Sequence, residues 1–216
     1  MLSVQQFVRF CAQHNCAPCS ICFQSVLPSA MPTEVIYLLS SARAHMQNPM
    51  QDPVFSASFY APYDAAISAG LSLLHDAQKF MPFDVLSVGS RLKSGPSIRG
   101  KLQRKHLPQT SAAAGAALRD IAGLRVVLTT REAVYRYAGL LCSSLDLEDI
   151  HDYIAAPKPS GYRSLHLIAR LPVHLACGDY CVPIEIQLRT AAMNAWACAE
   201  HALIYKRTTS EAHLNS

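Results

Sequence analysis

Long apolar runs and charged side chains are both scarce in this sequence. No stretch approaches the roughly eighteen consecutive apolar residues that a membrane-spanning helix needs, so we expect no membrane partner. The sequence does not begin with basic residues followed by an apolar block, which argues against a secretory signal and favours a cytoplasmic protein. Charged residues make up only 16% of the chain and apolar residues 50%, a balance typical of a folded domain rather than a disordered one.

Regular periodicity is missing from the first 55 or so residues, which are rich in Ser, Pro, Met, Gln and Asn. We therefore divide the chain into an N-terminal appendage, residues 1–55, and a folded domain, residues 56–216. The appendage is expected to be disordered, or to lie upstream of a true start at Met46 or Met50.

The eight cysteines are unevenly placed. Four lie in the appendage, at a short spacing that thiolate metal sites use, as Cys11, Cys16, Cys19 and Cys22. No second Cys/His pair follows at zinc-finger distance, so we interpret these four as ordinary cysteines. The other four occur in apolar contexts and are interpreted as small core residues: Cys142, Cys177, Cys181 and Cys198.

Basic residues are concentrated in the second half of the chain, although the net charge is only +4. Residues 1–90 contain three Lys or Arg against five Asp or Glu, whereas residues 91–216 contain sixteen against ten. A basic half of this kind suits an anionic small ligand or a nucleic acid.

Hydrophobic periodicity predicts two kinds of element. Helical spacing over residues 60–80 places five apolar residues on one face: Ala65, Ile67, Leu71, Leu74 and Phe80. A second helix should follow Thr130 as its N-cap, with Glu132 in the first turn, where the helix dipole favours an acid. Residues 109–117 are expected to be a flexible Ala/Gly/Ser segment. A last helix begins near residue 190, with Met193 and Trp196 in the core.

Strands are predicted at residues 124–130, 164–173 and 181–189, because β-branched and apolar residues are enriched there. The last two are expected to be joined by a Gly-Asp turn. No internal repeat is visible, and strands alternate with helices. The fold class is therefore α/β (α+β), a mixed β-sheet flanked by helices.

Residues 91–105 contain six Lys or Arg, and no acidic residue occurs between Asp84 and Asp120. Gly95-Pro96 should break the chain before Ser97, which we expect to cap a helix that begins at Ile98. Basic side chains around a helix N-terminus suit phosphate groups. The spacing is not that of a Walker loop, and the simpler interpretation is a solvated basic face.

Two carboxylates stand out near strand positions. Asp120 precedes the strand that begins near Arg125, a natural place for Mg²⁺ beside a phosphate-binding loop. Glu185 alternates with aliphatic residues, so it should share one strand face with Gln187 and Arg189. The alternatives remain open: Asp120 as a turn residue paired with Arg125, and Glu185 on a solvent face.

The segment "KPSGYRSLHL", residues 158–167, combines basic side chains with a glycine and a tyrosine. It could be a hairpin turn with a solvated rim. It could also be a pocket that stacks a flat ring on Tyr162 and neutralises phosphates with its neighbours. His166 is then either a ligand-binding residue or a packed core residue.

Four segments, in this order, resemble the successive motifs of the RelA/SpoT synthetase domain: "RLKSGPSIRGKL", "RDIAGLRVV", "KPSGYRSLHL" and "VPIEIQLRTAAMNAWACAEHALIYK". The resemblance covers about residues 60–206 and is strongest to the short, single-domain small alarmone synthetases. It implies a nucleotidyltransferase-like fold. It also implies an Mg²⁺-dependent pyrophosphokinase that moves pyrophosphate from ATP to the ribose 3′-hydroxyl of GDP or GTP. The products would be AMP and (p)ppGpp, the alarmone of the stringent response.

The resemblance also implies roles for individual residues on the ATP side. Two arginines, Arg91 and Arg125, would sandwich the adenine. Three residues would hold the ATP phosphates: Lys93, Ser97 and Lys101.

On the acceptor side, the resemblance implies that Asp120 and Glu185 are catalytic and hold Mg²⁺. Glu185 would also take the proton from the 3′-hydroxyl. The acceptor nucleotide would meet four residues, Tyr162 stacked on guanine, Asn194 at the base edge, and Lys158 and His166 near the phosphates.

Other activities remain open. Relatives of this kind also act as toxins that pyrophosphorylate adenosine nucleotides or the 3′ end of tRNA, which is the one case in which tRNA would be a partner. A non-catalytic nucleotide- or RNA-binding regulator is the second alternative. Against it stand Asp120, Glu185, Arg91 and Tyr162, which are all present. The chain ends ten residues after Lys206, so the sequence leaves open whether a homo-oligomer would be a dimer or a tetramer.

Overall fold

The computed structural model describes residues 54–200. In this part of the chain, helices pack on one five-stranded mixed sheet. The strand order is β1-β2-β5-β4-β3. The strands are β1 (Val85–Leu92), β2 (Ala122–Leu128), β3 (Asp146–Asp152), β4 (Leu165–Leu175) and β5 (Gly178–Thr190). Only β2 and β5 run parallel, and every other neighbouring pair is antiparallel. The predicted mixed sheet flanked by helices is confirmed.

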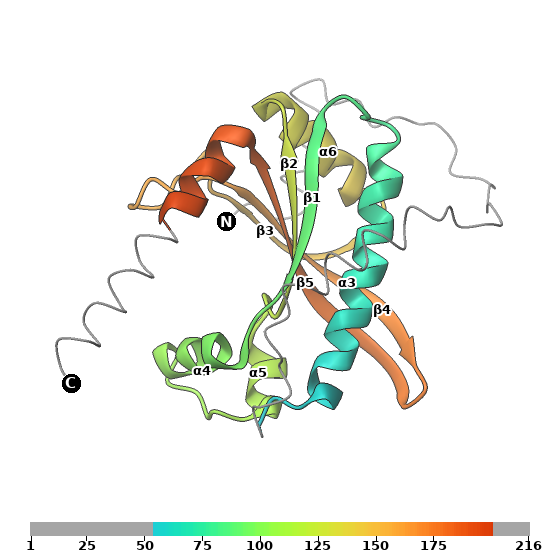
Figure 1. The fold of residues 1–216 in the computed structure, drawn as a ribbon, viewed down its shortest axis with the longest axis vertical. Helices are drawn as coiled ribbons and strands as arrows, with labels where there is room; N and C mark the ends of the chain where they lie inside the picture. Colours follow the sequence, from blue (N-terminus) through green and yellow to red (C-terminus); the bar gives the residue numbers. More distant parts are fainter. Residues whose placement is uncertain (1–53, 201–216) are drawn as a thin grey trace.

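Two helices, α3 (Ala57–Gln78) and α6 (Arg131–Cys142), cover one face of the sheet (Figure 1). The side chains of β2, β4 and β5 that point to these helices are aliphatic and almost all fully buried. Where α3 crosses the sheet, a Cβ on Gly70 would lie 2.5 Å from Leu124 Cδ1, so a residue without a side chain allows the close approach. The Tyr137 hydroxyl of α6 donates to the carbonyl of Leu74 at 2.6 Å and ties the two helices together.

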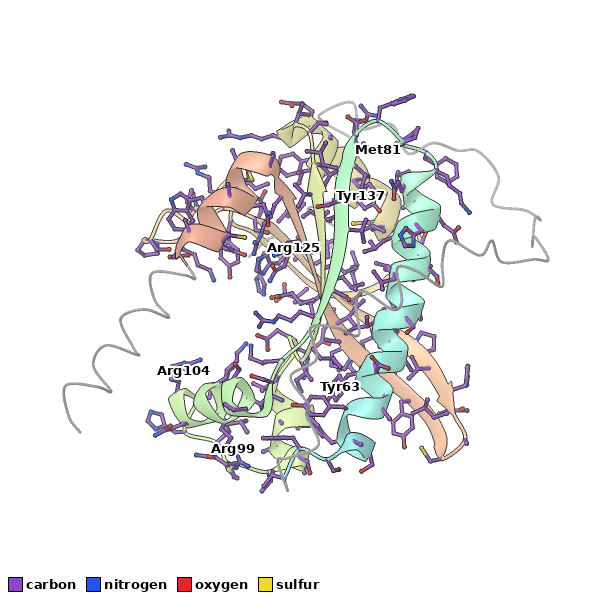
Figure 2. All side chains as sticks on the ribbon, viewed as in Figure 1. Tyr63, Met81, Arg99, Arg104, Arg125 and Tyr137 are labelled. Atoms are coloured by element: carbon purple, nitrogen blue, oxygen red, sulfur yellow. The ribbon has the colours of Figure 1, made fainter. Side chains whose placement is uncertain are left out.

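The opposite face of the sheet is polar and open. Figure 2 shows Tyr137 on the helix-covered side and Arg125 on the other. Two short helices, α4 (Gly95–Arg104) and α5 (Ser111–Ala117), lie together at one end of the sheet, and a helical segment, residues 191–200, follows β5. Strand alternation places aliphatic residues under the helices and polar residues on the open face, which is where the candidate site forms.

The helix after Thr130 is confirmed, since the Thr130 hydroxyl accepts from Ala133 N at 3.1 Å and Glu132 lies in the first turn. The three predicted strands correspond to β2, β4 and β5. Strands β1 and β3 were not predicted. Both are edge strands with one neighbour, so most of their residues stay partly exposed and show no regular alternation of apolar and polar residues.

The start of α4 corrects one prediction. The helix begins at Gly95 with Ser94 as N-cap, so Ser97 lies inside its first turn and does not cap it. Pro96 is tolerated there because an N–H in the first helical turn has no intrahelical partner to lose. Residues 111–117 are also helical, capped by Thr110, where a flexible segment was expected. The β4–β5 turn falls at residues 176–177, before the predicted Gly-Asp pair.

Several expected core residues are exposed. Phe80 lies beyond the end of α3 and is 65% exposed, because the chain turns after Gln78. Trp196 is 39% exposed, whereas Met193 is buried as predicted. The core assignment was wrong for three cysteines, since Cys177, Cys181 and Cys198 are exposed and Cys142 is half-buried. The four cysteines of the appendage lie outside the described residues.

The N-terminal boundary of the described structure is Val54, and Phe55 is already fully buried against the core. Within residues 54–200, no helix is both long and apolar enough to cross a membrane.

Candidate active site

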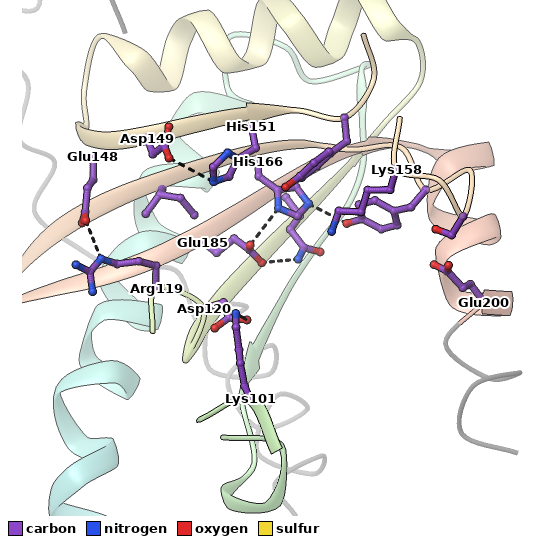
Figure 3. Close-up of a pocket in the computed structure, with 15 residues that line it drawn as sticks. Lys101, Arg119, Asp120, Glu148, Asp149, His151, Lys158, His166, Glu185 and Glu200 are labelled. Carbon is purple, nitrogen blue, oxygen red and sulfur yellow. Dashed lines mark hydrogen bonds and ion pairs between the residues drawn. The ribbon is translucent and has the colours of Figure 1, made fainter. Parts of the chain in front are cut away.

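A cavity of about 720 Å³ opens on the polar face of the sheet (Figure 3). Its walls come from β3, β4, β5, α4, the loop before β2, the turn before β4 and the helical segment 191–200. Six residues predicted for the site line it: Lys101, Asp120, Lys158, Tyr162, His166 and Glu185. The structure therefore brings together side chains that are up to 84 positions apart in the sequence.

Asp120 is the centre of a compact cluster of charges at the α4 end of the cavity. Its Oδ2 accepts from Lys93 Nζ and from Lys101 Nζ, both at 2.7 Å. Burial would raise the pKa of Asp120, but the hydrogen bonds and charges of Lys101 and Lys93 hold that pKa below its usual value. Burial lowers the pKa of Lys93, and Asp120 opposes this change. Asp120 Oδ1 is buried and has no hydrogen-bond partner among the described residues.

Glu185 lies on β5, across the cavity from Lys101 (Figure 3). Its Oε1 is 3.0 Å from His166 Nδ1, and its Oε2 accepts from Gln187 Nε2 at 2.6 Å. Burial would raise the pKa of Glu185, but the hydrogen bond and charge of His166 and the hydrogen bond of Gln187 bring it below its usual value. Glu185 is therefore a carboxylate at neutral pH, with a hydrogen bond to each oxygen.

The turn before β4 places a basic and an aromatic side chain at the cavity wall. Gly161 N donates to Lys158 O at 2.8 Å and Lys158 N donates to Tyr162 O at 3.2 Å. This closed turn requires φ +86° at Gly161, a conformation that favours glycine. The Lys158 ammonium then lies 4.5 Å from the Tyr153 ring centroid and 5.0 Å from that of Tyr162.

His166 is 6% exposed, yet it is more than a packed core residue. Both ring nitrogens have partners at the cavity, because Nδ1 meets Glu185 and Nε2 lies 2.8 Å from the Tyr162 hydroxyl.

Arg91 and Arg125 lie outside this cavity, on the same open face of the sheet. Arg91 pairs with Gly123 across β1 and β2, and Arg125 pairs with Gly89. The two arginines are therefore diagonal neighbours, each opposite a residue that has no side chain. Both side chains are exposed, so a flat group has room between them.

Two predicted residues stand apart from the cavity lining. Ser97 is exposed on α4, where its hydroxyl lies 3.0 Å from Ser94 Oγ. Asn194 is half-buried in the helical segment 191–200, and its Oδ1 has no hydrogen-bond partner within residues 54–200.

Sequence reasoning missed several lining residues. Glu148, Asp149, His151 and Tyr153 belong to or follow β3, an edge strand without a clear apolar pattern. Arg119 also lines the cavity and binds Glu148 at 2.7 Å. Gln187 shares the face of Glu185 by strand alternation, which was the available signal for its position.

The sequence profile described as "Region found in RelA / SpoT proteins" matches residues 90–210, more than half of the chain. The chain belongs to the RelA/SpoT family. It is 43% identical over 119 residues to the GTP pyrophosphokinase YwaC of Bacillus subtilis, covering 54% of this chain and 57% of that protein. It is 40% identical over 121 residues to the GTP pyrophosphokinase YjbM of the same organism, covering 55% and 56%. The chain thus spans little more than half the length of these curated relatives.

Solved structures of RelA/SpoT relatives share the fold. The small alarmone synthetase 1 of Bacillus subtilis bound to its product pppGpp superposes with a TM-score of 0.65 at 33% identity, over 70% of this chain and 80% of that one. A GTP pyrophosphokinase family protein from Streptococcus pneumoniae gives 0.64 at 33% identity, over 69% and 76%. The family and the α+β fold implied by the sequence motifs are confirmed.

Proposed function

We propose that this RelA/SpoT domain is a (p)ppGpp synthetase, which transfers pyrophosphate from ATP to the 3′-hydroxyl of GDP or GTP and releases AMP. One observation carries the proposal. Two half-buried carboxylates face one cavity, Asp120 beside two lysines and Glu185 beside His166, which in turn contacts Tyr162. We assign the end with the two lysines to the ATP phosphates, and the end with Glu185 and the Tyr162 ring to the acceptor nucleotide. The printed names of the relatives, which are GTP pyrophosphokinases, support the same reaction.

At the donor end, Arg91 and Arg125 would hold the adenine between their guanidinium planes, which stack well on flat rings. Lys93, just before α4, and Lys101, in its last turn, would meet the phosphates, and Ser97 lies in the first turn of the helix. Transfer of a charged group asks the protein mainly for alignment and charge neutralisation, and these lysines supply both.

At the acceptor end, Tyr162 would stack on the guanine and Asn194 would meet the base edge through its amide. The Asn194 oxygen without a protein partner suits the N–H donors that guanine presents. Lys158 and His166 would lie near the acceptor phosphates. Glu185, ionised and held by two hydrogen bonds, would take the proton from the attacking 3′-hydroxyl.

Asp120 and Glu185 would also hold Mg²⁺. The donor set fits, because Asp120 has a buried oxygen without a partner and the two carboxylates line one cavity. Residues 54–200 contain no group of three or more His, Cys, Asp or Glu arranged for a metal. Mg²⁺ does not need one, since it commonly binds one or two carboxylates and completes its shell with phosphates and water. When bound there, Mg²⁺ would neutralise charge on the transferred group.

The alternatives gain little from the site. Glu148 and Asp149 at the cavity are paired with Arg119 and His151, and nothing in this lining favours a tRNA end over GDP or GTP. A non-catalytic regulator would not need an ionised Glu185 facing a phosphate-binding end.

The test is a transfer assay with purified protein, Mg²⁺ and ATP labelled in the β-phosphate. GDP, GTP, ATP and deacylated tRNA are offered in parallel, and Glu185→Gln is the matched inactive variant. We expect label on GDP or GTP, and its loss in the variant. Label only on tRNA or on adenosine nucleotides would favour the toxin alternative, and equal transfer by the variant would refute the role of Glu185.

A further inference from the structure

Five side chains on the open face of the sheet form a closed ring of hydrogen bonds. The ring runs from Glu185 to His166, Tyr162, Arg189, Gln187 and back to Glu185. Its members come from β4, β5 and the turn before β4, and all five contacts are between 2.6 and 3.0 Å. Every contact has one donor and one acceptor, and the direction of each hydrogen bond can be worked out from the two members whose role is fixed.

Arg189 is the first unambiguous member, because a guanidinium only donates. Its Nη2 amino group carries two hydrogens, and both are used. One goes to the Tyr162 hydroxyl and one to Gln187 Oε1, each at 2.6 Å. Arg189 is 6% exposed, and its Nε lies 3.4 Å from the hydroxyl of the fully buried Ser164. This additional contact helps to fix the orientation of the guanidinium.

Glu185 is the second unambiguous member, because an ionised carboxylate only accepts. Gln187 must present its oxygen to Arg189, so its amide nitrogen points to Glu185 Oε2. The reversed amide would place two donors together at Arg189 and two acceptors together at Glu185. Arg189 thus decides which way the Gln187 amide faces.

Two arms connect Arg189 to Glu185, one through Gln187 and one through Tyr162 and His166. The directions of the hydrogen bonds in the second arm follow in the same way. The Tyr162 hydroxyl accepts from Arg189 and has one hydrogen left, which it gives to His166 Nε2. His166 then carries its proton on Nδ1 and donates to Glu185 Oε1. Both arms start at Arg189 and end on Glu185, so one arginine sets the direction of the hydrogen bonds on both carboxylate oxygens.

We propose that Arg189 and Gln187 are positioning residues, which fix the tautomer of His166 and the orientation of Glu185 and couple the Tyr162 hydroxyl to the base. The inference rests on the proposed function, since it assigns these residues to the reaction at Glu185. In this arrangement the ring and the hydroxyl of Tyr162 have different roles. Its ring face is available for stacking, while its hydroxyl is a link in the chain that holds Glu185.

The kinetic test uses Tyr162→Phe, which keeps the ring face and removes the hydroxyl. We expect kcat to fall about tenfold, the effect of one hydrogen bond of ordinary strength, with little change in KM for either nucleotide. Gln187→Met should give the same pattern through the other arm. If Tyr162 acts only as a stacking platform, Tyr162→Phe will leave kcat unchanged, and the proposal is wrong.

Arg189→Lys and Arg170→Met complete the comparison. Arg189→Lys keeps the charge and loses the planar fork, so kcat should fall although charge attraction for phosphates is retained. Arg170 is also a β-strand arginine that binds a carboxylate, Glu148 at 3.1 Å, but it is outside the ring, and Arg170→Met should keep wild-type kcat. Full rescue by lysine would show that Arg189 contributes only charge and would overturn the proposal.

The direct test is independent of activity. ¹⁵N NMR of the full chain, with the His166 signals assigned by comparison with His166→Gln, reports which ring nitrogen carries the proton. We expect a neutral ring protonated on Nδ1 in the wild type and a mixture of tautomers in Tyr162→Phe and in Arg189→Met. A proton on Nε2 in the wild type, or an unchanged tautomer in a folded Tyr162→Phe, would contradict the proposed directions of the hydrogen bonds. A wild-type chain without transfer activity would refute the proposed function. The His166 tautomer would still show whether the hydrogen bonds between Arg189 and Glu185 run as proposed.

Discussion

At Asp120, the positive charges of two lysines outweigh the effect of burial on the carboxyl pKa. A buried carboxylate would ordinarily resist ionisation, but two ammonium groups at 2.7 Å from one oxygen more than compensate. The side chains differ in exposure, with Lys93 at 9% and Lys101 at 30%, so the two ion pairs should differ in strength. The Lys93 pair belongs to the folded core, and the Lys101 pair to the cavity wall.

We predict that Asp120→Asn lowers the free energy of unfolding by about 2–3 kcal/mol, because it leaves a buried ammonium without its anion. Lys101→Met should cost less than about 1 kcal/mol, because Asp120 keeps Lys93 and the lost pair is partly exposed. Urea unfolding of both variants measures the difference. Equal losses would mean that the Lys93–Asp120 pair adds nothing to stability, and would contradict the prediction.

Gly161 is the other residue whose role depends on local geometry. Its positive φ closes the turn that carries Tyr162, and a Cβ there would lie 3.4 Å from Trp196 Cζ2. We predict that Gly161→Ala costs about 1–2 kcal/mol in the turn and raises KM for the acceptor nucleotide.

Gly178 is the matched control for that substitution. It also has a positive φ, +140°, but it lies at the start of β5 away from the cavity, and a Cβ there would meet nothing within 4 Å. Gly178→Ala should reduce stability and leave KM for the acceptor unchanged. A raised KM in both variants, measured in the transfer assay, would mean that the effect of Gly161→Ala is not local.

At the element scale, sequence patterns located the elements with a strong apolar signal. Strands β2, β4 and β5, the body of α3 and the capped start of α6 were predictable, because each buries a regular set of side chains. Edge strand β3 was not, since five of its seven residues are acidic or histidine and leave no apolar alternation. The start of α4 was misplaced because proline was treated as a break, although it is well suited to a first turn.

The N-caps of α6 and α4 should contribute differently to stability. The Thr130 hydroxyl accepts a hydrogen bond from Ala133 N at the start of α6, whereas Ser94 makes no side-chain cap bond at the start of α4. Thr130→Ala should therefore lower stability by about 1 kcal/mol, and Ser94→Ala should lower it by much less. Thermal unfolding monitored by circular dichroism compares the two. A larger loss in Ser94→Ala would contradict the capping geometry.

Across the whole molecule, one sheet serves two purposes. Its helix-covered face is aliphatic and supplies the core, and its open face carries the site (Figures 1 and 3). The sequence motifs predicted six of the lining residues, because each lies in a recognisable segment. The ring through Arg189 and Gln187 was beyond reach of the sequence, since it depends on the register of β4 against β5 and on a turn that brings Tyr162 back to them.

The proposed synthetase transfers pyrophosphate rather than a single phosphate, and the identity of its products tests this directly. ³¹P NMR of the full chain with Mg²⁺, ATP and GTP follows all products at once. We expect AMP and a guanosine nucleotide with a 3′-pyrophosphate in equal amounts, and neither product with Glu185→Gln. Formation of ADP or inorganic phosphate in place of AMP would contradict it.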